Sequence, residues 1–327
     1  MSHVHDVLVI GGGPSGSSCA YWLAEAGWDV ALVESKVFPR EKTCGDGLTP
    51  RSVRQLADMG VEETLTDAHR YGGMRTHAYG RVLDMAWPEH PTFPSYGYVI
   101  SRHDLDGIVN ERAVKAGARV WQGTEALEPV LAPDSSSRSS SRSWPRSAPT
   151  GSGRAGAPAG GAASRTLLPP CTGAVVKDKD NGTVRTIEAR YVVVADGSNS
   201  RFGRALGTAR DRRQPMGLAL RGYYRSPGHD QPFIESHLDI RDGEGDVVPG
   251  YGWIFPMGDG RVNAGVGLLS TEQRWKGVNT STLMEHFVAG APAEWELSPA
   301  TSLGPPTGGK LPMGLSIGPR IGPTTVV

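Results

Sequence analysis

Cysteine, net charge and long apolar runs are all scarce in this sequence, and each shortage excludes a class of protein. The 327 residues contain 3 cysteines, an odd number at wide spacing, which fits neither a disulfide framework nor a cysteine zinc cluster. We therefore expect no metal and a reducing, cytoplasmic location. Basic and acidic residues balance at 34 each, so no surface for nucleic acid is expected.

Hydrophobic runs are short throughout the chain. No stretch of about 18 apolar residues is present, so no membrane-spanning helix is expected. The segment Met1 to Asp6 lacks the basic region of a secretory signal, so no signal peptide is expected either.

The first 34 residues carry the sharpest pattern. An apolar run at 7–10 leads into a glycine turn at 11–16, then a helical pattern at 17–26 and a second apolar run at 30–33. This order predicts a strand, a helix and a parallel strand. The turn fits G-x-G-x-x-G at Gly11, Gly13 and Gly16, which permits a tight turn and close approach of a pyrophosphate. Pro14 and Ser15 then open the helix whose N-terminus faces the phosphates.

Glu34 ends the second of these strands. A carboxylate at this place accepts a hydrogen bond from a ribose 2′-hydroxyl, and it disfavours a 2′-phosphate. The pattern therefore predicts a dinucleotide site for NAD or for the adenosine half of FAD.

The middle of the chain continues in the same style around one unusual segment. We expect a helix at 101–116, a strand at 119–122, a hairpin at 173–177 and 184–189, and a strand at 191–195. Between them, residues 133–170 are mostly Ser, Gly, Ala, Pro and Arg, which predicts a disordered insertion. Its five arginines would allow contact with an anionic membrane, but a solvated linker is the favoured interpretation.

The apolar period changes to two after Met216. Apolar and polar residues alternate in segments separated by turn-rich stretches, at 218–220, 234–240, 251–255 and 262–268. This pattern predicts an antiparallel sheet. A short helix is expected near 282–288. The expected organisation is a dinucleotide-binding domain at 1–132 and 171–212, the insertion at 133–170 and a substrate domain at 213–310. Residues 311–327 would begin the return to the first domain.

Further motifs identify a family resemblance. Asp196 and Gly197, after a buried strand, resemble the Asp-Gly motif of flavoprotein hydroxylases and reductases. The loop at 42–50, with sequence KTCGDGLTP, more narrowly resembles the geranylgeranyl reductase family. Within that family, FPR at 38–40 and PGYGWIFP at 249–256 are similar to the bacterial menaquinone reductases.

The resemblance implies an α/β fold with a Rossmann-like, p-hydroxybenzoate hydroxylase-like FAD-binding domain and an antiparallel β-sheet substrate domain. It implies FAD as the cofactor, with the pyrophosphate at 11–16 and the adenosine ribose at Glu34. Its further implied cofactor contacts are Cys44, Gly45 and Gly47 on the flavin side, Arg102 near the cofactor, Ala126 at the adenine, and Asp196 with Gly197.

Tyr251, Trp253 and Phe255 alternate along one predicted strand. Their side chains should project from the same sheet face and form an aromatic wall suited to a long isoprenoid chain. The alternative is a core face that packs on a helix.

The resemblance implies reduction of isoprenoid double bonds in a prenyl lipid or prenylquinone, with an unknown electron donor. Cys44 is the candidate catalytic proton donor, and the substrate suggests peripheral contact with the inner face of the membrane. The alternatives are a flavin-dependent aromatic monooxygenase or halogenase, or a non-catalytic remnant. The family's third flavin motif, Gly-Asp-Ala-Ala, is expected directly after Val327. The chain is therefore expected to be a truncated fragment that binds FAD poorly.

Overall fold

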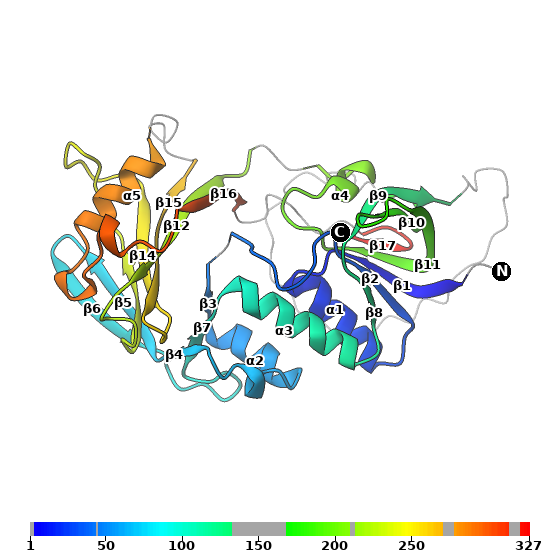
Figure 1. Cartoon of the computed structure of the whole chain (residues 1–327), viewed down its shortest axis with the longest axis horizontal. Coiled ribbons are helices and arrows are strands. Elements are labelled where there is room, and N and C mark those ends of the chain that lie inside the picture. The colour runs from blue at the N-terminus through cyan, green and yellow to red at the C-terminus, as the bar shows by residue number, and fades with distance from the viewer. Residues whose placement is uncertain (1–2, 44, 133–167, 210–212, 271–277, 314–320) are drawn as a thin grey trace, which may run out of the picture.

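The computed structural model describes residues 3–43, 45–132, 168–209, 213–270, 278–313 and 321–327. Cys44 and residues 133–167 of the predicted insertion lie outside this part of the chain. The described part forms two large sheets and one small one, with α1 and α3 beside the first large sheet and α5 on the second (Figure 1). No helix in these residues is long and apolar enough to cross a membrane.

The first sheet has the order β8-β2-β1-β11-β10-β9, with β17 also paired to β11. Its strands are β1 (Val4–Ile10), β2 (Val30–Val33), β8 (Arg119–Trp121), β9 (Thr124–Leu131), β10 (Cys171–Asp178), β11 (Val184–Val194) and β17 (Thr325–Val326). The pairs among β8, β2, β1 and β11 are parallel, while β10 pairs with both its neighbours in the antiparallel sense. This confirms the predicted Rossmann-like architecture.

Helices α1 (Pro14–Glu25) and α3 (Arg102–Lys115) pack together beside this sheet. Ser101 caps α3 by accepting a hydrogen bond from the Asp104 N–H, and Gly117 follows its end with φ of +107°. On the other side, Phe202 of α4 (Arg201–Ala205) joins the apolar cluster beneath β10 and β11. Both faces of the sheet are therefore covered, which explains why β2 is buried at every position.

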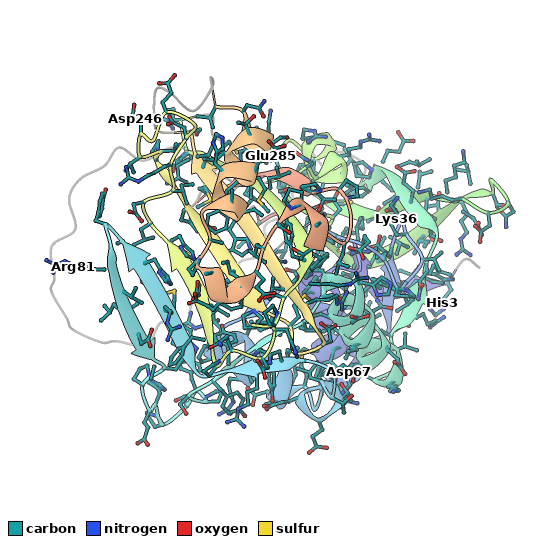
Figure 2. The ribbon with its side chains drawn as sticks, turned by 60° about the vertical axis from the view of Figure 1, so that its left-hand side comes forward. His3, Lys36, Asp67, Arg81, Asp246 and Glu285 are labelled. Carbon is teal, nitrogen blue, oxygen red and sulfur yellow. The ribbon has the colours of Figure 1, made fainter. Side chains whose placement is uncertain are left out.

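The second large sheet has the order β16-β12-β15-β14-β13-β5-β6. Its strands are β5 (Gly73–Ala78), β6 (Arg81–Ala86), β12 (Met216–Arg225), β13 (Phe233–His237), β14 (Gly250–Pro256), β15 (Arg261–Leu269) and β16 (Thr307–Pro312). Helix α5 (Thr280–Ala289) lies across one face, with the exposed Glu285 labelled on it in Figure 2. Leu283, Met284 and Phe287 of α5 are buried against this sheet.

The remaining elements are short. A third sheet has the order β3-β7-β4, from β3 (Gly47–Leu48), β7 (Gly97–Val99) and β4 (His69–Tyr71), and α2 (Pro50–Asp58) lies nearby. The 3-10 helices are η1 (Glu62–Thr64), η3 (Ala293–Trp295) and η4 (Pro299–Thr301).

Strand pairing corrects the sequence-based expectations in three places. Strands β5 and β6 come from within 1–132 but pair into the second sheet, so residues 73–86 depart from the expected first domain. The pair β5–β13 is parallel, so the second sheet is mixed. The two strands expected at 184–189 and 191–195 form a single strand, β11. The first half of β11 pairs with β10, and its second half pairs with β1. The wider division into domains stays a prediction.

Candidate functional site: the cleft beside the glycine turn

The glycine turn is dictated by close backbone packing at two of its three positions. A Cβ on Gly11 would lie 2.5 Å from the Ala195 carbonyl oxygen, and one on Gly16 would lie 1.8 Å from the Gly11 carbonyl oxygen. At Gly13 the nearest heavy atom to an added Cβ is an Arg40 nitrogen at 3.8 Å. Open space at Gly13, which caps α1 without a side-chain acceptor, leaves the helix N–H groups free to approach a pyrophosphate.

The Glu34 side chain stabilises the glycine turn through hydrogen bonds. Its carboxylate is 8% exposed; Oε2 accepts a hydrogen bond from the Gly12 N–H at 2.8 Å, and Oε1 accepts one from the Lys36 N–H at 2.9 Å. The sequence predicted a contact from this carboxylate to a ribose. The structure adds that the same group fixes the backbone of the glycine turn.

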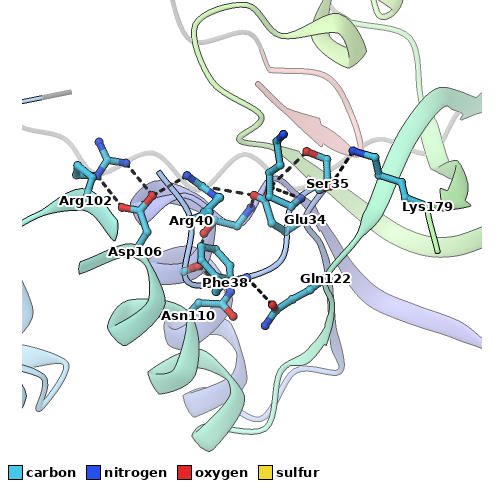
Figure 3. Close-up of polar contacts among 12 residues, drawn as sticks. Glu34, Ser35, Phe38, Arg40, Arg102, Asp106, Asn110, Gln122 and Lys179 are labelled. Atoms are coloured by element: carbon cyan, nitrogen blue, oxygen red, sulfur yellow. Dashed lines mark hydrogen bonds and ion pairs between the residues drawn. The ribbon is translucent and has the colours of Figure 1, made fainter. Parts of the chain in front are cut away.

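A chain of four charged side chains extends from Glu34 to α3 (Figure 3). Arg102 donates to both oxygens of Asp106, at 2.6 and 2.9 Å, and Arg40 lies 3.1 Å from the same carboxylate. A second Arg40 nitrogen lies 3.6 Å from Glu34. The Asp106 side chain is fully buried, and a buried charge needs compensation. The guanidinium groups of Arg40 and Arg102 provide it. Sequence reasoning noted Arg40 within the FPR motif but gave no role to it or to Asp106.

Glu34, Arg40 and Arg102 line a cleft of about 430 Å³. Its walls contain most of the predicted cofactor contacts, namely Gly11, Gly13, Pro14, Ser15, Glu34, Arg102, Ala126, Asp196 and Gly197. Lys36, Arg40, Lys42 and Arg201 add basic groups that suit an anionic pyrophosphate. Gly16 supports the turn beneath the cleft. The residues present thus fit the diphosphate and adenosine parts of FAD.

Besides Gly16, the predicted contacts Gly45 and Gly47 are not among the lining residues of this cleft. Gly45 has no heavy atom within 4 Å of an added Cβ. A Cβ added to Gly47, in β3, would lie 3.2 Å from the Phe255 ring. Cys44 lies outside the described residues, so its predicted roles stay predictions. Gly47 therefore belongs to the contact between the loop and the second sheet.

The aromatic side chains of β14 form one row. Ring centroids are 5.6 Å apart for Tyr251 and Trp253 and 6.3 Å apart for Trp253 and Phe255. The intervening Ile254 faces the other way and is buried in a cluster with Phe287 of α5. This confirms that the three aromatic residues share a face. The row lies on the side of the sheet opposite α5. Trp253 is 6% exposed, and whether this face binds substrate or belongs to the core stays open as in the prediction.

Glycines on β15 allow the aromatic rings to lie flat on the sheet. Gly265 pairs with Trp253 and Gly267 pairs with Tyr251. An added Cβ on Gly265 would lie 2.2 Å from the Trp253 ring, and one on Gly267 would lie 3.1 Å from the Tyr251 ring. A larger side chain at Gly265 would displace the indole.

Asp46 connects the loop of the cleft to this aromatic row. The Tyr223 hydroxyl and the Asn263 amide each donate to its Oδ2 at 2.7 Å, and the Trp253 Nε1–H donates to the Asn263 Oδ1 at 2.9 Å. Asp46 is 1% exposed. Burial raises the pKa of its carboxyl, and the hydrogen bonds from Tyr223 and Asn263 oppose the rise.

Sequence reasoning missed Asp46 as a separate functional residue. Its partners come from β12 and β15, far along the chain, and no local pattern indicates them. Its position between two glycines in an otherwise polar loop is the one available signal.

Comparisons with known proteins extend these observations. Residues 4–137 match a family model described as an FAD binding domain. Two proteins named menaquinone reductase, from Mycolicibacterium smegmatis and Mycobacterium tuberculosis, are 36% and 37% identical over 97% and 89% of this chain. The chain spans 68% and 61% of their lengths. Digeranylgeranylglycerophospholipid reductase 1 of Methanopyrus kandleri is 28% identical over 92% of the chain and 69% of that protein.

Solved structures share the fold. A geranylgeranyl bacteriochlorophyll reductase-like protein from Thermoplasma acidophilum has a TM-score of 0.71 and 20% identity, covering 99% of this chain and 70% of that one. The myxobacterial chondrochloren halogenase has a TM-score of 0.65 and 19% identity, covering 95% and 64%. At these identities the likeness concerns the fold alone.

Proposed function

This chain belongs to the FAD-dependent geranylgeranyl reductase family, which includes the menaquinone reductases, and from that premise we propose that it reduces isoprenoid double bonds. The substrate class would be a prenylquinone or a prenyl lipid. The names of the relatives, which specify menaquinone and a digeranylgeranyl lipid, support this class. Because the substrate is apolar, we include peripheral contact with a membrane in the proposal.

The proposal rests on the path of one short loop, residues 40–47, between the cofactor cleft and the aromatic row. Arg40 and Lys42 of this loop line the cleft that suits FAD. A few residues further on, Asp46 is hydrogen-bonded to Asn263 and Gly47 contacts the Phe255 ring. The loop therefore joins the cofactor cleft to an aromatic row, as a reaction between FAD and an apolar chain requires.

Bound FAD, once reduced, would supply a hydride to one carbon of the alkene. Isolated alkenes accept hydride poorly, so positioning by the protein must lower much of the barrier. Glu34, Arg40 and Arg102 would hold the adenosine and diphosphate side. Tyr251, Trp253 and Phe255 would bind the isoprenoid chain through apolar contact and exclude water around it.

Asp46 acts in this proposal as a positioning residue. Its carboxylate fixes the Asn263 amide, which in turn fixes the Trp253 indole through a hydrogen bond to Nε1. The second alkene carbon needs a proton, and Cys44 stays the proposed donor.

The experiment is a single-turnover assay without oxygen. The protein is loaded with FAD, photoreduced, and mixed with a prenylquinone in detergent, and the product is analysed by mass spectrometry. We expect a product with two added hydrogens in the side chain for the wild type and its loss in Trp253→Ala. Trp28→Ala is the matched control, because Trp28 is 47% exposed and lies away from β14. Oxygen consumption with an aromatic substrate, and no saturated product, would favour the monooxygenase alternative instead.

A further inference from the structure

Three metal-ligating side chains meet on the face of the second sheet opposite the aromatic row. Glu235 and His237 lie two residues apart on β13, so they share a face, and His77 of β5 is the cross-strand partner of His237. Glu235 pairs with Ile254, which faces α5. The ligand atoms of all three side chains lie within 4.8 Å of one another.

The Glu235 side chain is 1% exposed. Few groups close to its carboxylate compensate the negative charge. His237 Nε2 lies 3.0 Å and His77 Nε2 lies 3.3 Å from the same oxygen, Oε2. The other oxygen, Oε1, has no hydrogen-bond partner among the described residues, and neither has His77 Nε2. Buried polar atoms without partners cost free energy, so these atoms indicate a missing ligand.

Arg75 supplies that compensation only weakly. Arg75 lies 3.9 Å from Glu235 Oε1, but its Nε and one terminal nitrogen donate to Asp84 at 2.7 and 2.9 Å. Arg75 is thus paired more closely with Asp84 than with Glu235, and most of the compensation of the Glu235 charge is left to the two imidazoles. A divalent cation would satisfy the carboxylate and both imidazoles at once.

We propose that His77, Glu235 and His237 form a binding site for a divalent transition-metal ion, with Zn²⁺ as the best fit. Two imidazole nitrogens and one carboxylate oxygen are a recurrent zinc donor set, and water would occupy the fourth position. Bonds of about 2.0 to 2.2 Å in a tetrahedron separate the donors by about 3.3 to 3.6 Å. The two distances from Glu235 Oε2 to the imidazole nitrogens, 3.0 and 3.3 Å, are close to this range.

Binding requires one local adjustment. The two imidazole rings are stacked with centroids 4.3 Å apart and an interplanar angle of 10°. One ring must rotate about χ2, a broad torsion in histidine, so that both Nε2 lone pairs converge on the metal. The bound ion would then link β5 to β13 and stabilise the attachment of the β5–β6 hairpin to the sheet. The sequence predicted no metal, so this site departs from that expectation.

Co²⁺ absorption tests the proposal on the full chain after treatment with a chelator. We expect one Co²⁺ per chain with the strong visible bands of tetrahedral coordination, displaced by Zn²⁺. His237→Ala and Glu235→Gln should each lower the affinity at least 100-fold. His3→Ala is the matched control, because His3, His5 and Asp29 form a separate group of possible ligands at the first sheet.

Two results would overturn the site. One is the absence of tetrahedral bands in the wild type, and the other is loss of the bands in His3→Ala with retention in His237→Ala. Should His237→Ala fail to fold, His77→Gln, at a position that is 18% exposed, replaces it. Zn²⁺ should raise the melting temperature of the wild type but not of His77→Gln, and an equal rise in both would also contradict the proposal.

Discussion

Replacing Glu34 by alanine should weaken FAD binding at least tenfold. The proposed ribose contact is a charge-assisted hydrogen bond worth about 1.5 to 3 kcal/mol, which corresponds to roughly tenfold to somewhat over a hundredfold in affinity. The carboxylate also accepts the Gly12 and Lys36 N–H groups, so its removal loosens the glycine turn as well. Both effects act in the same direction.

Comparison of ADP with 2′-deoxy-ADP separates the loss of the ribose contact from the loosening of the glycine turn. Fluorescence titration measures FAD, ADP and 2′-deoxy-ADP with the wild type, Glu34→Ala and the exposed control Glu63→Ala. The wild type and the control should prefer ADP over 2′-deoxy-ADP, and Glu34→Ala should bind the two equally. Unchanged FAD affinity in Glu34→Ala would refute the assignment of this carboxylate. A persistent preference for ADP would refute the ribose contact alone.

Three further predictions concern the aromatic row and the buried acids. Trp253→Ala should reduce turnover of a prenyl substrate at least tenfold while flavin content stays near that of the wild type; a joint loss of flavin and folding would show instead that the indole is a structural core residue. Asp46→Ala should raise KM and lower kcat more than Asp46→Asn, because asparagine keeps one oxygen that accepts from both Tyr223 and Asn263; equal kinetic defects would contradict the positioning role. Since burial raises the pKa of Asp46 in the folded state, its contribution to stability is present below the ordinary aspartate pKa and is lost as pH rises through the folded value. Urea denaturation across this window should show that the stability of the wild type falls relative to Asp46→Asn as pH increases, and a constant difference would count against the raised pKa.

Local patterns predicted the first sheet well, because its signals are short in sequence. The apolar run before Gly11, the glycine turn and Glu34 lie within one unit of strand, helix and strand. Only glycine fits at Gly11 and Gly16 for steric reasons, so the sequence carries the geometry directly. The cleft residues Ala126 and Asp196 came from the family resemblance, not from spacing.

The same reasoning could not predict contacts between segments that lie far apart in the sequence. Strand β5 pairs with β13, and Asp46 meets Tyr223 and Asn263, although nothing in the local sequence indicates either partner. The group of His77, Glu235 and His237 was missed for this reason, since a Glu-x-His pair on one strand is an ordinary pattern until a third ligand joins it. Tertiary pairing, and not local propensity, determines these features.

The most direct test of the proposed reaction is the mass of the product formed in one anaerobic turnover. The protein with photoreduced FAD should convert a prenylquinone into a product that carries two additional hydrogens on an isoprenoid unit, and flavin absorbance should return in equal amount. Flavin that stays reduced, with the substrate recovered unchanged while the cofactor is bound, would contradict the account.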